Sequence, residues 1–251
     1  MLKIENLRKS FGGVVATNGV SLHFPKGSLS AVIGPNGAGK TTFFNLITGA
    51  FKPNSGRILL DGQDIAGLSP TEIVRRGIGR AFQIARIFPS LTVRESILCA
   101  VQAHRNQHAI MRRRFPLAED ADRAEHVMNL VGLTPRANTV SRNLSHGDQK
   151  LLDIALALVL EPQVLLLDEP TAGMGPEERW AMIDTVQRMW EAEKMTLIFI
   201  EHDMSIVFKI AQSIKVLSYG AVLAEGTPEE IRRHPEVIKA YLGDEFEDGH
   251  A

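Results

Sequence analysis

Residues 34–42 read GPNGAGKTT and match the phosphate-binding pattern G-x-x-x-x-G-K-S/T. In this pattern the glycines let backbone N–H groups turn toward a row of phosphates, Lys40 reaches the β- and γ-phosphates, and Thr41 offers a hydroxyl to magnesium. The apolar run at 29–33 predicts a buried strand before the loop, and the apolar spacing over 40–48 predicts a helix after it. Phosphates at a helix N-terminus meet free N–H groups and a favourable dipole. The stretch therefore predicts a nucleoside triphosphate site.

Charge, cysteine content and apolar runs argue against a nucleic-acid-binding, a disulfide-bonded or a membrane-spanning protein. A formal net charge of −1 gives no general attraction for nucleic acid. The single cysteine, Cys99, cannot form an internal disulfide, which fits a reducing compartment. The N-terminus carries Lys3, Glu5 and Arg8 within its apolar stretch, so it predicts a strand and not a signal peptide. The longest uninterrupted apolar run, 154–160, is far shorter than a membrane span, so we expect any membrane association to go through a partner.

The order of strand and helix patterns predicts an α/β fold. Strand-like segments separated by turn residues precede the phosphate loop and predict antiparallel pairing. From about Ala85 to Leu160 helical signals replace strand signals, and afterwards strands and helices alternate, which predicts a mainly parallel sheet. The fold expected is a phosphate-loop core with N-terminal antiparallel strands and an inserted helical subdomain. The expected strands are 2–8, 14–17, 20–24, 56–61, 163–168, 196–200, 214–218 and 221–225; the expected helices include 118–131, 147–160, 176–193 and 203–211; the capping boxes are Ser69 with Glu72 and Thr92 with Glu95.

Two strand ends carry polar side chains suited to nucleotide chemistry. The apolar run 164–167 ends in Asp168 and Glu169. A carboxylate at the tip of a buried strand is well placed to hold magnesium, and a second one beside it can take a proton from an attacking water. Another strand leads into Glu201, His202 and Asp203. From spacing alone, His202 or Asp203 either caps the next helix or acts on the nucleotide.

The segment 144–149, LSHGDQ, opens a long apolar helix and has two interpretations. Ser145 at the N-cap with Asp148 three positions later is an ordinary capping box. The same helix start, with a serine hydroxyl and free N–H groups, also forms a phosphate site. We call 144–149 the signature segment, and its sequence is compatible with both interpretations.

Taken together, the motifs resemble the ATP-binding subunits of ABC transporters. The phosphate loop, Gln83 after a strand, LSHGDQ, LLLDEP and EHD occur in the order of that family, from about Met1 to Asp244. The stretches GRAFQIARIFPSLTVRESI, DEPTAGMGPEE and IKAYLG resemble the subgroup that serves branched-chain amino acid importers. The resemblance implies one ABC ATPase domain over 1–251, with a nucleotide-binding core at 1–84 and 161–243, a helical subdomain at 85–160 and a flexible tail at 244–251.

The resemblance also implies roles for single residues. Phe11 would stack on adenine, and Glu169 would polarise the attacking water while His202 contacts the γ-phosphate. Gln83 would touch both magnesium and that water. Asp168 would hold magnesium through the shell of ligands around the ion, and Thr41 would offer it a hydroxyl. The phosphates would be bound by Asn36, Gly37, Gly39, Lys40, Thr41 and Thr42, and by Ser145 and Gly147 from a partner chain. The chain departs from the family pattern at His146 and Asp148, which replace glycine and glutamine of LSGGQ, and at Gly175, where an aspartate is expected.

The implied activity is ATP hydrolysis coupled to the import of branched-chain or related amino acids. ATP and Mg²⁺ are the implied cofactors. The implied partners are a second ATP-binding subunit, either another copy or a related chain, and membrane-spanning subunits docked near 83–91. The implied location is the cytoplasmic face of the inner (plasma) membrane, as a peripheral subunit, with no nucleic acid bound.

Other functions share parts of this pattern. The ATPase subunit of a lipid or lipopolysaccharide exporter is the nearest alternative. A small-molecule kinase would also use Lys40 and Asp168, but it needs an acceptor pocket and a basic lid. ABC proteins that act on DNA or ribosomes usually have two cassettes or a long coiled-coil insertion, which the sequence lacks. His104 and His108 have the spacing of metal ligands without an apparent third ligand, and the basic run 112–114 is either a solvated face or a contact for lipid headgroups or the membrane subunit.

Overall fold

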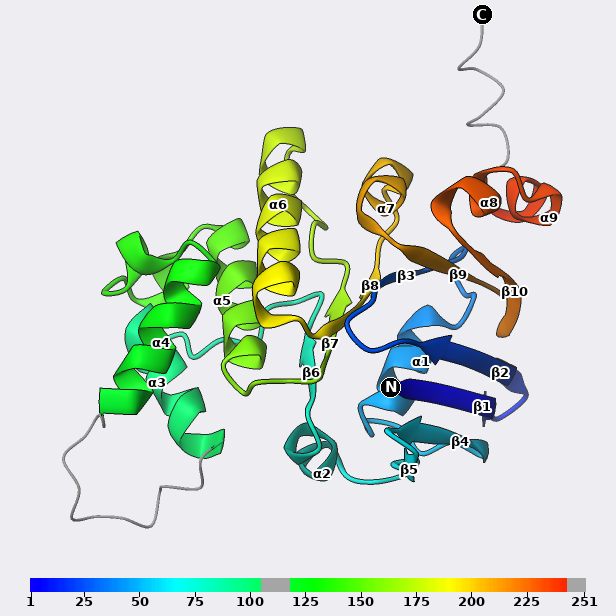
Figure 1. Cartoon of the computed structure of the whole chain (residues 1–251), viewed down its shortest axis with the longest axis horizontal. Coiled ribbons are helices and arrows are strands. Elements are labelled where there is room, and N and C mark those ends of the chain that lie inside the picture. Colours follow the sequence, from blue (N-terminus) through cyan, green and yellow to red (C-terminus); the bar gives the residue numbers. More distant parts are fainter. Residues whose placement is uncertain (105–117, 243–251) are drawn as a thin grey trace, which may run out of the picture. The chain divides into compact units, whose positions relative to one another are not determined.

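The computed structural model describes residues 1–104 and 118–242, and these fall into two compact units (Figure 1). The first unit combines the two ends of the chain, Met1–Ile73 and Thr196–Ala251. The second unit is the intervening segment, Val74–Met195. The boundaries expected for a helical subdomain at 85–160 stay a prediction. The expected tail 244–251, His108 and the basic run 112–114 lie outside the described residues.

The first unit contains an antiparallel sheet, formed by two strands that precede the phosphate loop in the chain and two that follow it. Its strand order is β2-β1-β4-β5. The two strands predicted at 14–17 and 20–24 are one continuous strand, because Gly19 forms a bulge: Leu7 pairs with Val20 and Arg8 with Asn18, and Gly19 has a φ of 74°. The strands are β1 (Leu2–Phe11), β2 (Val14–Phe24), β4 (Ser55–Leu60) and β5 (Gln63–Asp64).

Parallel strands form the other sheet region of the first unit. β3 (Leu29–Ile33) pairs in parallel with β8 (Thr196–Ile200) and with β9 (Ser213–Ser218), and β10 (Ala221–Gly226) adds to β9 in the antiparallel direction. Every residue of β3 and β8 is buried, as expected for strands covered on both faces. The helices of this unit are α1 (Lys40–Ile47), α7 (Met204–Ile210), α8 (Pro228–Arg232), α9 (Pro235–Val237) and the short π-helix η4 (Ile238–Leu242).

The second unit is mostly helical around one pair of strands. β6 (Ile78–Ala81) and β7 (Val164–Asp168) pair in parallel, and α5 contacts both. The helices are α3 (Val93–His104), α4 (Ala118–Leu130), α5 (His146–Leu158) and α6 (Pro176–Glu193), with 3₁₀ turns η2 (Thr134–Arg136) and η3 (Ser141–Asn143). The short α2 (Pro70–Arg75) spans the boundary between the units. Parallel strands, N-terminal antiparallel strands and a helical segment confirm the predicted α/β fold class.

Both predicted capping boxes are present. Glu72 accepts a hydrogen bond from the Ser69 backbone N–H at 2.9 Å, and Glu95 accepts one from the Thr92 backbone N–H at 2.7 Å. Each hydroxyl in turn accepts from the N–H of its glutamate. These pairs fix where α2 and α3 begin. None of the helices described within 1–104 and 118–242 has both the length and the apolar character needed to span a bilayer.

Candidate nucleotide-binding site

Lys40 begins α1, and its ammonium lies inside the curve of the phosphate loop. Nζ donates to the backbone oxygens of Gly34 at 2.7 Å and Pro35 at 3.1 Å. The side chain is buried, with a relative exposure of 7%. The positive charge of Lys40, which is predicted to bind the phosphates, is therefore held close to the loop backbone at the N-terminus of α1.

Glycine is required at the end of this loop. Gly39 is the N-cap of α1 with a φ of 97°, in the left-handed region that glycine adopts without strain. A Cβ at this position would lie 2.2 Å from the backbone oxygen of Ala16. Gly37, in the same loop, has a φ of 80°. Any other residue at Gly39 would push the loop away from β2.

His202 follows the strand beside the phosphate loop. In the parallel pair, Val32 of β3 lies opposite Ile200 of β8, so the loop after β3 and the His202 segment leave the same edge of the sheet. Asp203 is the N-cap of α7 and accepts the Ser205 N–H at 3.0 Å. Asp203 therefore caps the helix, and the γ-phosphate contact of His202 stays a prediction.

Phe11, predicted to stack on adenine, lies at the end of β1 with 43% exposure. Its ring packs edge-on against Phe51, with centroids 5.1 Å apart, and Lys9 Nζ lies 5.0 Å from its centroid. An exposed aromatic ring held by two neighbours is an available stacking surface.

In the second unit, the register of β6 and β7 brings two predicted site residues into contact. Ala81 lies opposite Leu167, so Gln83 and Glu169 both follow the carboxyl end of the pair. Gln83 Nε2 donates to Glu169 Oε2 at 2.7 Å. Glu169 has a φ of 51°, which is uncommon for a residue other than glycine. Strained backbone of this kind concentrates at functional sites.

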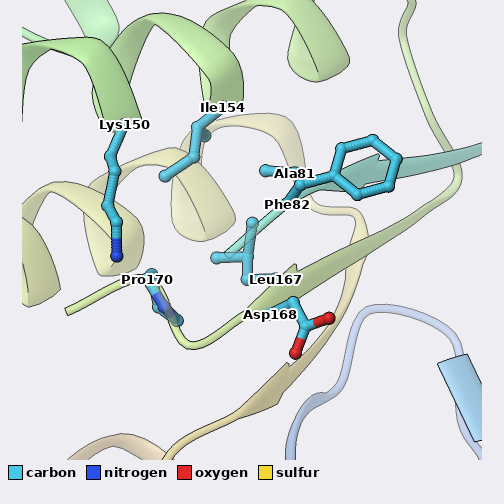
Figure 2. Close-up of a pocket in the computed structure, with 7 residues that line it drawn as sticks. All are labelled: Ala81, Phe82, Lys150, Ile154, Leu167, Asp168 and Pro170. Carbon is cyan, nitrogen blue, oxygen red and sulfur yellow. The ribbon is translucent and has the colours of Figure 1, made fainter. Parts of the chain in front are cut away.

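Arg80, which no sequence pattern singled out, makes a buried ion pair with Asp168. Arg80 Nη2 lies 2.6 Å from Asp168 Oδ2, and the exposures of the two side chains are 7% and 6%. A charged residue in the short, otherwise buried strand β6 was the available signal. Asp168 also borders a small pocket lined by Ala81, Phe82, Lys150, Ile154, Leu167, Asp168 and Pro170 (Figure 2).

The signature segment begins α5 with a side-chain cap. Ser145 is the N-cap, and its Oγ accepts the Asp148 N–H at 3.1 Å. The Asp148 carboxylate lies 3.7 Å from Arg136 Nε, so its charge has a cationic neighbour. A Cβ on Gly147 would lie 2.2 Å from Glu178 Oε1, the end of an exposed and flexible side chain that would have to move. The capping interpretation is confirmed for Ser145, and it is compatible with phosphate binding at the same helix start.

The donor atoms of the predicted magnesium ligands suit that ion. Thr41, Gln83 and Asp168 offer hydroxyl, amide and carboxylate oxygens, which are the hard ligands that Mg²⁺ takes. Within 1–104 and 118–242, no cluster of three or more His, Cys, Asp or Glu side chains is arranged to hold a metal ion. His104 thus has no such cluster in the described part of the chain.

A phosphate loop alone is shared by many nucleotide-binding proteins. In this chain a helix begins with Ser145 and Gly147 shortly before the strand that ends in Asp168 and Glu169. Among phosphate-loop proteins, this combination is typical of ATP-binding cassettes, the class of ATPase found in ABC transporters. The sequence model of the ABC transporter family matches residues 17–172, and that of the branched-chain amino acid ATP-binding cassette transporter matches 221–247. The chain belongs to the ABC transporter family, as an ATP-binding subunit that hydrolyses ATP.

Named relatives and solved structures agree with this assignment. The chain is 40% identical to the high-affinity branched-chain amino acid transport ATP-binding proteins BraF of Pseudomonas aeruginosa and LivG of Escherichia coli, covering 97% of this chain and 98% of each relative. It superposes on the ADP conformation of an ABC transporter cassette with a TM-score of 0.84 at 30% identity, covering 97% of this chain and 99% of that one. A dimeric post-hydrolysis cassette bound to ADP and Pi gives a TM-score of 0.77 at 25% identity, over 91% and 99%.

Proposed function

We propose that this subunit powers an importer of branched-chain or related amino acids. The observation that carries the proposal is the 40% identity, over 97% of the chain, to BraF and LivG, whose names give that role. The match of the C-terminal residues 221–247 to a branched-chain cassette model supports it independently, because that segment lies outside the general ABC match at 17–172.

The proposed roles of single residues are those that the family's motifs imply. Lys40 holds the β- and γ-phosphates, with the loop N–H groups of Asn36, Gly37, Gly39, Thr41 and Thr42 around them. Glu169 accepts a proton from the attacking water. The hydrogen bond from Gln83 Nε2 to Glu169 Oε2, 2.7 Å long, holds the two side chains together and supports a shared role. His202 contacts the γ-phosphate. Phe11 stacks on adenine, and Ser145 and Gly147 complete the site of a partner subunit.

Magnesium fits the oxygen donors of Thr41, Gln83 and Asp168. When bound, it would neutralise charge on the phosphate oxygens. Arg80 fixes one oxygen of Asp168 through a hydrogen bond of 2.6 Å, so the orientation of this ligand is set before any cation binds.

The proposed partners are membrane-spanning subunits and a second ATP-binding subunit, either a copy of this chain or a related one. The segment 83–91 exposes two large apolar side chains, Ile84 at 83% and Phe88 at 48%. Removing these two side chains from water against a protein partner would be favourable, which supports docking at this segment. The complex would place this chain peripherally on the cytoplasmic face of the inner membrane.

The test uses the full transporter in proteoliposomes. Lys40→Ala should abolish ATP binding or turnover, because the loop loses its point charge for the phosphates. Glu169→Gln should keep ATP binding and lose hydrolysis, because an amide cannot accept the proton of the water. Lys52→Ala, an exposed lysine in the same unit, is the matched control and should behave as the parent.

Uptake of leucine, isoleucine or valine, measured in the same vesicles, tests the solute. ATP-dependent uptake that Lys40→Ala eliminates would support the proposal. Parent ATPase activity in Lys40→Ala would contradict the site. ATPase activity stimulated by lipid, with none of the three amino acids transported, would instead favour the exporter.

A further inference from the structure

Two buried side chains of opposite charge project from neighbouring positions of α5. Lys150 and Asp153 are three residues apart, so they lie on one face of the helix, and their exposures are 3% and 5%. Neither has a role in the site described above. Charged groups are seldom fully buried unless they are paired or hydrogen-bonded, so their contacts need an explanation.

Asp153 ties the helix to the segment that follows β6. Its Oδ2 accepts the Phe82 backbone N–H at 2.7 Å, and its Oδ1 accepts the Arg86 backbone N–H at 2.9 Å. These two amides flank Gln83. Burial raises the pKa of Asp153, while the two N–H donors and the charges of Arg86 and Lys150 act in the opposite direction. Both carboxylate oxygens are thus used to hold the backbone around Gln83.

Lys150 ties the same helix to the segment that follows β7. Its Nζ donates to the backbone oxygens of Glu169 at 3.0 Å and Ala172 at 2.9 Å. Figure 2 shows Lys150 reaching from α5 toward the chain at Pro170, between these two carbonyls in sequence. The carbonyl of Glu169 belongs to the residue with a φ of 51°, so Lys150 helps to hold a backbone conformation that a glutamate seldom adopts.

The two tethered segments meet at the side chains proposed to act on water. Gln83 Nε2 and Glu169 Oε2 are 2.7 Å apart. The N-cap of the tethering helix is Ser145 of the signature segment. Hydrogen bonds to charged groups are roughly twice as strong as those between neutral groups. A helix fixed to both segments by such bonds carries them with it when its N-terminus is moved.

We propose that Lys150 and Asp153 are positioning residues that fix Gln83 and Glu169 relative to the signature helix. Engagement of Ser145 by a partner's nucleotide is thereby passed to the groups that orient the attacking water. This inference rests on the proposed roles of Gln83 and Glu169. It adds that the alignment of their side chains is set by α5 and not by the strands alone.

The first measurement is the steady-state ATPase activity of the full-length protein with Asp153→Asn. Asparagine keeps the shape but places an NH₂ group against one of the two N–H donors, so one tether is lost. We expect kcat to fall about tenfold to a hundredfold, as small misplacements of reacting groups do. Affinity for ADP should stay at the parent value, because the phosphate loop and Phe11 are unchanged. Lys150→Met should behave in the same way.

Two further variants separate positioning from general stability. Asp153→Glu keeps two acceptor oxygens and should recover part of the lost kcat. Asp184→Asn makes the same chemical change at an exposed position of α6 and should leave kcat unchanged. A loss of ADP affinity equal to the loss of kcat in Asp153→Asn would contradict the proposal, as would Asp153→Glu being no more active than Asp153→Asn.

Amide hydrogen exchange in the nucleotide-free protein tests the tether without relying on activity. In Asp153→Asn the amides of Phe82 and Arg86 should exchange about tenfold faster or more, while those of β7 keep the parent rate. Uniformly faster exchange across the second unit, or unchanged exchange at both amides, would overturn the proposal.

Gln83→Ala distinguishes failure of this inference from failure of the proposed site. If Gln83→Ala keeps the parent kcat, the proposed role of Gln83 is contradicted. If Gln83→Ala lowers kcat and Asp153→Asn lowers it further by an independent, additive amount, the positioning role alone is contradicted. We expect the double variant to lose little more than Gln83→Ala, because residues acting through one group are not additive.

Discussion

At the scale of single residues, Arg80 compensates the buried negative charge of Asp168. Arg80 and Asp168 have exposures of 7% and 6% and lie 2.6 Å apart, so each neutralises a charge that water cannot reach. Arg80→Met removes one partner and leaves a buried carboxylate uncompensated. Breaking such a pair typically lowers the free energy of unfolding by about 3–5 kcal/mol, and we expect a loss of this order in urea unfolding without nucleotide.

The double variant Arg80→Met with Asp168→Asn is the matching control for that loss. With no charge left to bury, it should recover much of the stability that Arg80→Met loses. Two outcomes would contradict this expectation: Arg80→Met being as stable as the parent, or the double variant being no more stable than Arg80→Met. Either would show that, without Arg80, the Asp168 carboxylate is hydrated or finds another partner.

The residues that sequence reasoning missed share a physical cause. The chemistry of Glu169 follows from its place after an apolar strand, and its contact with Gln83 follows from two strands ending at one edge. Arg80, Lys150 and Asp153 read as ordinary charges in a strand and a helix. Their partners lie 88, 19 and 71 residues away for the bonds to Asp168, Glu169 and Phe82, and only the folded chain brings them together.

At the scale of elements, local sequence predicted the bounds of some helices and strands to the residue. α6 and β8 begin and end at the expected residues, 176–193 and 196–200. The prediction of two strands at 14–17 and 20–24 is wrong, because Val14–Phe24 forms one strand. The pairing with β1 keeps the strand continuous, and Gly19 is accommodated as a bulge. Long-range pairing overrode a local signal there.

The capping box of α3 should make stability depend on pH. Accepting the backbone and hydroxyl hydrogen bonds of Thr92 lowers the pKa of Glu95. A lowered folded-state pKa means that the contribution is complete above the ordinary glutamate pKa of about 4.3 and is lost as the pH falls through the folded value. Glu95→Gln should therefore lower the melting temperature at pH 7 and remove part of its fall below pH 4.

Melting curves of Glu95→Gln and the parent between pH 3 and pH 7 check this expectation. Glu119→Gln, an exposed glutamate in the first turn of α4, serves as the control and should keep the parent's acid dependence more closely. Parallel curves for parent and Glu95→Gln over the whole range would mean that the carboxylate does not stabilise the helix start.

At the scale of the whole molecule, the family followed from the sequence because its motifs are short and local. The phosphate loop, the signature segment and the Asp168–Glu169 strand end each fit within ten residues. The residues with proposed roles are spread more widely along the chain: Lys40 and His202 lie in the first unit, and Gln83, Ser145 and Glu169 lie in the second. No single short motif therefore carries all of the proposed roles.

The charge of Asp148 should affect how readily two subunits close around a nucleotide. Its carboxylate belongs to the helix start that would approach a γ-phosphate, and a fixed negative charge opposes that approach. Arg136 Nε, 3.7 Å away, offsets part of the repulsion. We predict that Asp148→Gln raises ATP-driven dimerisation and ATPase activity, and that Arg136→Gln lowers both because it leaves the carboxylate without its cation.

Salt dependence separates this repulsion from a capping effect. The Debye length is about 30 Å at 0.01 M and about 8 Å at 0.15 M salt, so both changes should be larger at the lower ionic strength. The measurement is ATPase rate against protein concentration at the two ionic strengths, beside a melting curve in which Asp148→Gln falls slightly. In Asp148→Gln, the further change Arg136→Gln should have little effect, since no carboxylate remains to shield. Equal shifts at both ionic strengths, or an unchanged concentration dependence, would place Asp148 away from the nucleotide and leave it a stabiliser of the start of α5 alone.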